Sequence, residues 1–302
     1  MGILETHLAG IRLKNPAILA SGFLGMSPEI AQRIADSGAG AVMLKTVFTY
    51  PRKGHNNPTV LGWEAGMINA VGLPGQGIKN VEWEEYEKLK VPLIISIAGD
   101  NLPQFQEAIK IVAQKKIAAI ELNLSCPNVE NGMVWSIRPE PAEELVRACK
   151  KASGKIPVFA KLTPQANNIA AVARACEKAG ADGITAINTV GPGMIIDINS
   201  AKPVLANKCG GVSGPAIRPI AVRCVYDIYE AVKIPIIGTG GITNGRDAIE
   251  MMMAGATALG IGSAAYYQGF DVFKNICSEM QGWMKEHKYK SLDEIRGLAH
   301  EK

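Results

Sequence analysis

An α/β barrel is the fold class that the sequence predicts, because eight short apolar runs alternate with stretches of helical spacing along the 302 residues. Several of these runs are continuously apolar, which is typical of parallel strands buried on both faces. The segments KAGADGI (178–184) and MAGATAL (253–259) each leave a helix at a glycine and enter a strand within a few residues. Eight such units predict a closed TIM (β/α)8 barrel and not an open doubly wound sheet.

The predicted elements follow in order along the chain. A short hairpin at 4–13 is expected to cover the bottom of the barrel. The eight strands are predicted at 17–20, 41–45, 93–98, 119–123, 158–162, 183–188, 235–238 and 258–262. Amphipathic stretches predict helices at 103–116, 141–152, 168–179, 217–231 and 245–254.

Three insertions are expected at the mouth of the barrel. A plain barrel needs about 250 residues, which leaves roughly 50 for additional segments. The segments 46–77, 127–139 and 189–213 follow the second, fourth and sixth strands, and the first is rich in Gly, Pro and Asn. They are expected to be loops at the carboxyl end, where such barrels build their active sites. Without a linker or a low-complexity tract, residues 1–302 are expected to form a single domain.

Composition excludes several classes of protein. Lys and Arg number 32 and Asp and Glu 28, and a net charge of +4 gives no reason to expect nucleic-acid binding. No run approaches the roughly 18–20 apolar residues of a membrane span. The first ten residues lack the apolar core of a signal peptide, so a cytoplasmic protein is expected. The six cysteines contain no C-x-x-C pair and the four histidines are scattered, so no metal site is expected.

Polar residues gather where the predicted strands end. Ser21 follows the first strand, and Lys45 and Thr46 end the second. Further strand ends carry Asn123, Lys161, Asn188 and Thr189. A lysine at the end of a buried strand is costly unless an anion or a dipole meets it. These side chains therefore predict a polar, ring-sized ligand with anionic parts.

Glycines end the last two strands. Gly240-Gly241 and Gly262-Ser263 leave backbone N–H groups accessible near helix starts, which favours a phosphate-bearing cofactor. The segment 260–265 fits G-x-G-x-x-A, but no strand with an acidic residue follows it, so it is not a dinucleotide-binding fingerprint. A nicotinamide would therefore have to react elsewhere or through a partner.

Cys126 is the strongest single candidate for chemistry. It lies in a loop just past the fourth strand, at the expected barrel mouth. No histidine lies nearby in the sequence to form a nucleophilic pair, which favours acid/base work over acyl transfer. Four cysteines lie in helical patterns and are interpreted as structural thiols, namely Cys149, Cys176, Cys224 and Cys277, whereas Cys209 stays undecided.

These motifs together resemble the dihydroorotate dehydrogenase family. The resemblance runs almost end to end and is carried by LKT (44–46), NAVGLPGQG (69–77), NLSCPN (123–128), AKLTP (160–164), INT (187–189), GGVSGPAIRPIA (210–221) and GTGGI (238–242). The segment 193–219 is most similar to class 1B catalytic subunits, which use NAD. A cysteine at position 126 fits class 1, since class 2 enzymes carry serine there.

The resemblance implies a bound FMN and a pyrimidine substrate. The implied FMN contacts are Ala20, Ser21, Lys45, Thr46, Asn123, Lys161, Ile187, Gly214, Gly240, Gly241, Gly262 and Ser263. Ser96 stands where the family commonly has an asparagine, which weakens one implied flavin contact, although a hydroxyl can still bond the ring. The implied contacts of orotate or dihydroorotate are Lys45, Asn69, Gly72, Leu73, Asn123, Asn128, Asn188 and Thr189.

The resemblance also implies a reaction and a partner. Cys126 would take a proton from C5 of dihydroorotate while flavin N5 accepts the hydride from C6. Lys45 would offset the substrate carboxylate, and Lys161 would stabilise charge at the flavin. A second subunit with FAD and a [2Fe–2S] cluster would pass the electrons to NAD, with two such subunits flanking a dimer of this chain.

Three alternatives remain open at this point. One is a class 1A enzyme of the same family that reduces fumarate. Another is a dihydrouridine synthase that acts on tRNA, against which the low net charge and the lack of an added basic domain count. The third is a non-catalytic flavin-binding barrel, since barrels host many roles.

Overall fold

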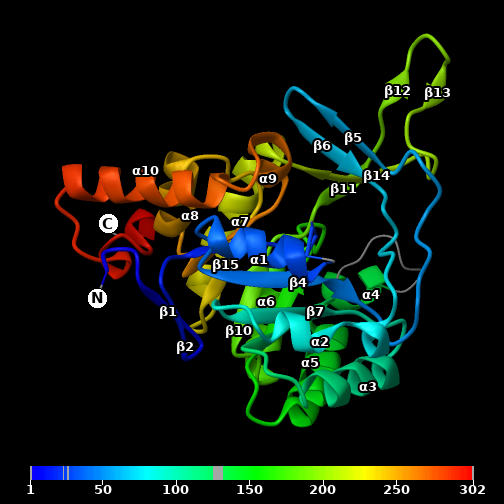
Figure 1. Cartoon of the computed structure of the whole chain (residues 1–302), viewed down its shortest axis with the longest axis horizontal. Coiled ribbons are helices and arrows are strands. Elements are labelled where there is room, and N and C mark those ends of the chain that lie inside the picture. The colour runs from blue at the N-terminus through cyan, green and yellow to red at the C-terminus, as the bar shows by residue number, and fades with distance from the viewer. Residues whose placement is uncertain (1, 23, 26, 125–131, 301–302) are drawn as a thin grey trace.

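The computed structural model describes residues 2–22, 24–25, 27–124 and 132–300. Eight parallel strands close into a barrel in the order β10-β15-β16-β3-β4-β7-β8-β9 (Figure 1). They are β3 (Ala17–Leu19), β4 (Ala41–Val47), β7 (Leu93–Ile97), β8 (Ala119–Asn123), β9 (Val158–Leu162), β10 (Gly183–Ala186), β15 (Ile236–Thr239) and β16 (Ala258–Ile261). The predicted barrel is confirmed, and each predicted strand lies within two residues of an observed one at both ends.

Helices surround the barrel. The longer ones are α1 (Pro28–Asp36), α3 (Leu102–Val112), α5 (Pro139–Ser153), α6 (Ile169–Lys178), α7 (Arg218–Ala231), α8 (Gly245–Met253) and α10 (Val272–Glu286). The short helices are α2 (Trp83–Tyr86), α4 (Gly132–Ile137) and α9 (Ser263–Gln268), with 3-10 turns η1 (Ile78–Asn80), η2 (Pro215–Ile217), η3 (Leu292–Glu294) and η4 (Leu298–His300). The five predicted helices are confirmed.

Local sequence explains where several of these helices begin. Ser27, Asn101, Asn168 and Asn244 each accept a backbone N–H of the first turn with their side chain. Such caps satisfy donors that a helix leaves unpaired at its start. In the described part of the chain, no helix is both long and apolar enough to cross a bilayer.

The predicted hairpin is present as β1 (Thr6–Leu8) and β2 (Ile11–Leu13). Leu8 and Leu13 are fully buried and pack in one cluster with Ile18, Met43 and Phe159 from the barrel strands. This apolar cluster fills the amino end of the barrel, so the barrel is a packed core there and opens only at its other end.

The insertions at the mouth contain a sheet, where the sequence predicted loops. Strands β5 (Val60–Trp63), β6 (Gly66–Asn69), β11 (Val190–Gly193) and β14 (Gly210–Ser213) form an antiparallel sheet in the order β11-β14-β6-β5. A small hairpin, β12 (Ile196–Asp197) with β13 (Lys202–Pro203), extends beyond it at the upper right of Figure 1. Asn69 pairs with Gly211 across this sheet. Because the paired segments lie far apart in the sequence, local composition did not reveal the pairing.

Candidate active site

A pocket with about 1130 Å³ of empty space, part of it open to solvent, lies at the carboxyl end of the barrel. The predicted site residues that line it are Ala20, Ser21, Lys45, Thr46, Asn69, Gly72, Leu73, Asn123, Lys161, Ile187, Asn188, Thr189, Gly214, Gly240, Gly241, Gly262 and Ser263. Segments that are distant in the sequence thus converge on one cavity, as expected for parallel strand ends.

The remaining predicted site residues are Ser96, Cys126 and Asn128. Ser96 is not among the residues that line the pocket; it is fully buried and bonded to other polar side chains. Cys126 and Asn128 lie outside the described residues. The pocket also contains residues that the sequence did not single out, namely Gly22, Val60, Met67, Val71, Ser213, Ile217, Thr239, Ile242 and Gly260.

Side chains alternate between the two faces of a strand, and this alternation decides which polar groups point into the barrel and at what height. On β8, Ala119 belongs to the apolar cluster that fills the amino end, and Glu121 and Asn123 follow it at two-residue steps on the same face. On β9, Phe159 and Lys161 follow the same order. The inward faces of the strands are therefore apolar at the bottom and polar at the mouth.

Two lysines are buried in the pocket wall. Lys45 on β4 is 8% exposed and Lys161 on β9 is 5% exposed. The β4–β7 register shifts between Leu44 and Val47, which allows both Lys45 and the next residue, Thr46, to reach the pocket. Lys161 lies beside Asn123 in the β8–β9 register. Two buried ammonium groups make this wall suited to an anionic ligand.

Glu121 is the main polar residue that the sequence analysis missed. Its side chain is fully buried, and its Oε1 accepts hydrogen bonds from Ser21 Oγ at 2.6 Å and Ser96 Oγ at 2.9 Å. Lys161 Nζ donates to Ser21 Oγ at 3.0 Å and lies 3.8 Å from Glu121 Oε1. A glutamate within the apolar run AIELN was the available signal.

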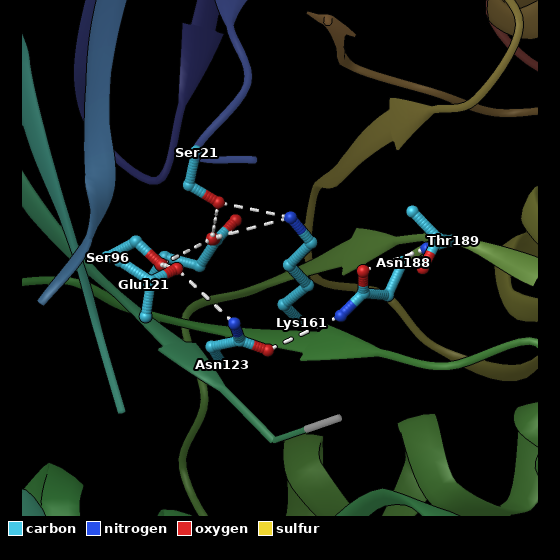
Figure 2. Close-up of polar contacts among 8 residues, drawn as sticks. Ser21, Ser96, Glu121, Asn123, Lys161, Asn188 and Thr189 are labelled. Atoms are coloured by element: carbon cyan, nitrogen blue, oxygen red, sulfur yellow. Dashed lines mark hydrogen bonds and ion pairs between the residues drawn. The ribbon is translucent and has the colours of Figure 1, made fainter. Parts of the chain in front are cut away.

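A chain of hydrogen bonds connects this carboxylate to the asparagines of the pocket (Figure 2). Ser96 Oγ and Thr46 Oγ1 are 2.9 Å apart, and Asn123 Nδ2 donates to Thr46 Oγ1 at 3.3 Å. Asn188 Nδ2 donates to Asn123 Oδ1 at 3.4 Å, and the Thr189 N–H donates to Asn188 Oδ1 at 2.8 Å. The predicted cofactor and substrate residues thus belong to one polar network.

Glycines shape the rest of the wall. Gly240 has a φ of +134°, and a Cβ there would lie 2.7 Å from the Ala221 Cβ. A Cβ on Gly262 would meet only Ala20 Cβ, at 3.8 Å, and both residues line the pocket. Glycine is thus required at 240 for the backbone, whereas at 262 it leaves open space inside the pocket.

Four of the five described cysteines are poor candidates for catalysis. Burial raises the pKa of Cys149, Cys176 and Cys277 to about 12 and that of Cys224 to about 11. These thiols stay neutral near pH 7, and the thiolate is the reactive form. Cys149, Cys176 and Cys224 are buried, as predicted for structural thiols, whereas Cys277 is partly exposed beside the core and Cys209 is partly exposed in its loop.

Comparison with known proteins supplies the family. The family model described as dihydroorotate dehydrogenase matches residues 3–284. The chain is 46% identical over 307 residues to the "Dihydroorotate dehydrogenase B (NAD(+)), catalytic subunit" of Methanocaldococcus jannaschii, covering 99% of each chain. It is 46% identical to the protein of the same name from Pyrococcus abyssi, over 98% of this chain and 99% of the relative. With that from Methanothermobacter thermautotrophicus it shares 43% identity over 99% of both chains. The chain belongs to the dihydroorotate dehydrogenase family.

Proposed function

We propose that this chain is a single-domain FMN-binding subunit that oxidises (S)-dihydroorotate to orotate, with NAD as the final acceptor, in pyrimidine biosynthesis. The observation that carries the proposal is the pocket at the barrel mouth, where two buried lysines and a network of asparagines line one cavity. Its relatives named as catalytic subunits of an NAD(+) enzyme support the same activity. The family match counts against the tRNA-modifying alternative.

The described residues fit FMN. Gly262 leaves space in the pocket that a side chain would fill, and Gly240 and Gly241 line the same cavity. These positions would take the phosphate end, while Ser21, Thr46 and Lys161 would contact the ring system. FMN, when bound, supplies the acceptor for the hydride that leaves C6 of the substrate. The Lys161 ammonium would stabilise negative charge at this end of the pocket.

Other residues would bind and orient dihydroorotate. Lys45 would pair with the substrate carboxylate, and Asn69, Asn123 and Asn188 would match the donors and acceptors of the pyrimidine ring. Val60 and Met67, on the β5–β6 hairpin, give the same cavity an apolar wall that would exclude water. Cys126 would remove the C5 proton, with Thr189, Gly72, Leu73 and Asn128 completing the substrate contacts.

A partner subunit completes the proposed enzyme. The curated relatives are named catalytic subunits, which supports the existence of a second chain. From the family resemblance we infer that this partner carries FAD and a [2Fe–2S] cluster, and the absence of a C-x-x-C pair among the six cysteines of this chain is consistent with a separate cluster-bearing subunit. Two copies of each chain would form a heterotetramer.

Anaerobic titration of the FMN-loaded protein with dihydroorotate tests the proposal. The expected result is stoichiometric bleaching of the flavin absorbance with release of one orotate per flavin. Turnover with NAD should require the partner subunit, which distinguishes this enzyme from a fumarate reducer. Absence of bleaching would contradict the proposed substrate, and efficient turnover of the isolated chain with fumarate would contradict the NAD-linked class.

Replacing Gly262 with valine tests the position of the cofactor. Gly262 has a φ of −122°, and the space at its Cβ is open, so a side chain at this position meets no close neighbour. The two methyl groups would occupy pocket space, and we expect flavin affinity to fall by at least about tenfold, roughly 1.4 kcal/mol. Gly282→Val on α10 is the control, since a Cβ there would meet nothing within 4 Å and Gly282 does not line the pocket. Equal FMN affinity in G262V and wild type, measured by fluorescence titration, would place the cofactor elsewhere.

A further inference from the structure

Glu121 begins a hydrogen-bond chain whose direction is fixed by chemistry. Ser96 has one hydroxyl proton, and it donates that proton to Glu121 Oε1. The Ser96–Thr46 contact at 2.9 Å therefore has Thr46 as its donor, because Ser96 has no second proton to offer. Thr46 Oγ1 is then left as an acceptor, and it accepts the amide N–H of Asn123.

The same direction continues into the asparagines. With its Nδ2 turned to Thr46, Asn123 presents its Oδ1 to the amide nitrogen of Asn188. At the far end of the chain the Thr189 N–H, which can only donate, fixes the position of Asn188 Oδ1. The oxygen and nitrogen of an asparagine amide are nearly equal in size, so hydrogen-bond partners decide which end points where. Both asparagines line the pocket, whereas Glu121 and Ser96 are fully buried and are not among the residues that line it.

We propose that Glu121 is a positioning residue that sets the donor and acceptor pattern of the pocket wall through Ser96 and Thr46. It holds the Asn123 amide from one end of this chain, as the Thr189 N–H holds Asn188 from the other, and so it helps to set which edge of Asn123 faces a bound ring without touching the ligand. This inference rests on the proposed function, because it takes a pyrimidine carboxylate as the ligand. An Asn123 amide turned the other way would suit a ring with the opposite pattern of donors and acceptors at that position.

The binding of two ligands with opposite hydrogen-bonding patterns tests this proposal directly. Orotate carries an N3–H donor and a C4 oxygen acceptor, and cytosine-6-carboxylate has an acceptor and an amino donor at the same positions. Their dissociation constants for the FMN-loaded protein follow from the change in flavin absorbance. Wild type should prefer orotate, since a mismatch leaves buried polar groups unpaired.

Three variants separate an acceptor role of Glu121 from a charge role. Glu121→Met and Ser96→Ala each free the Thr46 proton, so the Asn123 amide can turn, and the preference for orotate should fall about fivefold to tenfold. Glu121→Gln keeps an oxygen at the Oε1 position and exchanges only Oε2, which has no hydrogen-bond partner among the described residues. It should therefore keep the preference within about twofold of wild type.

Ser153→Ala is the matched control for S96A. Ser153 is also buried, but it lies on α5, where its hydroxyl is within hydrogen-bond distance of two backbone oxygens, Lys150 at 3.0 Å and Ile156 at 3.2 Å. Its loss should leave the preference unchanged. An unchanged preference in both E121M and S96A would overturn the proposal. So would a loss in E121Q as large as in E121M, since charge would then be the cause.

A second readout does not depend on the substrate. In protein labelled with ¹⁵N-asparagine, the side-chain amide signals of Asn123 and Asn188, identified from their loss in N123D and N188D, should move in S96A and stay in place in S153A. If the wild type binds neither orotate nor cytosine-6-carboxylate, the proposed function is wrong. The amide signals of Asn123 and Asn188 would still test the role of Glu121 in that case. Unmoved signals in S96A would overturn it.

Discussion

Replacing Cys126 with alanine is expected to lower kcat for dihydroorotate at neutral pH by at least about 100-fold, the usual contribution of a general base. The FMN content should not change, because none of the pocket residues proposed to hold the cofactor is altered. Stopped-flow measurement of flavin bleaching under anaerobic conditions measures the reduction of the flavin by dihydroorotate without the partner subunit. Full activity of C126A would show that another group removes the C5 proton.

Two further variants make the Cys126 result specific. Cys126→Ser keeps an ionisable hydrogen at the same place but with a far higher pKa than a thiol, roughly 8.5. Its residual activity should therefore rise with pH well beyond the range where the wild type levels off. Cys277→Ala is the control, because Cys277 lies on α10 and does not line the pocket. It should match wild type in both kcat and pH profile.

The strand-end lysines show what a sequence can predict about such a site. Lys45 and Lys161 are 116 positions apart, yet both line the cavity, because parallel strands of a barrel end at the same mouth. Their location depends only on recognising the strands and their direction. The same reasoning placed Asn123 and Asn188 correctly at the pocket.

The buried residues Ser96 and Glu121, which contact the pocket-lining side chains, could not be predicted in the same way. Ser96 and Glu121 are partners in the β7–β8 register, so their contact depends on how two strands align. The sheet at the mouth likewise depends on pairing of β6 with β14, about 140 residues further along the chain. Sequence periodicity indicates that a strand exists and which residues share its face, but it does not indicate the neighbour.

Replacing Lys161 with methionine is expected to destabilise the fold and abolish flavin binding together. Lys161 and Glu121 form an ion pair at 3.8 Å with side chains 6% and 0% exposed, and Ser21 bridges them. Removing one partner of a buried pair leaves the other charge unpaired and costs about 3–5 kcal/mol. A fall in Tm of at least about 5 °C should follow in thermal unfolding of the flavin-free protein. Lys88→Met, in an exposed pair with Glu85, should change Tm little.

The double variant Lys161→Met/Glu121→Gln separates stability from function. Glutamine removes the unpaired charge and keeps an acceptor for the hydroxyls of Ser21 and Ser96, so most of the lost Tm should return. Flavin binding and turnover should not return, because no cation remains at position 161 to meet negative charge in the pocket. If the double variant regained flavin binding as well as stability, the lysine would serve only to neutralise Glu121. If neither returned, the destabilisation of K161M would not arise from the unpaired carboxylate, and the pair would contribute through packing.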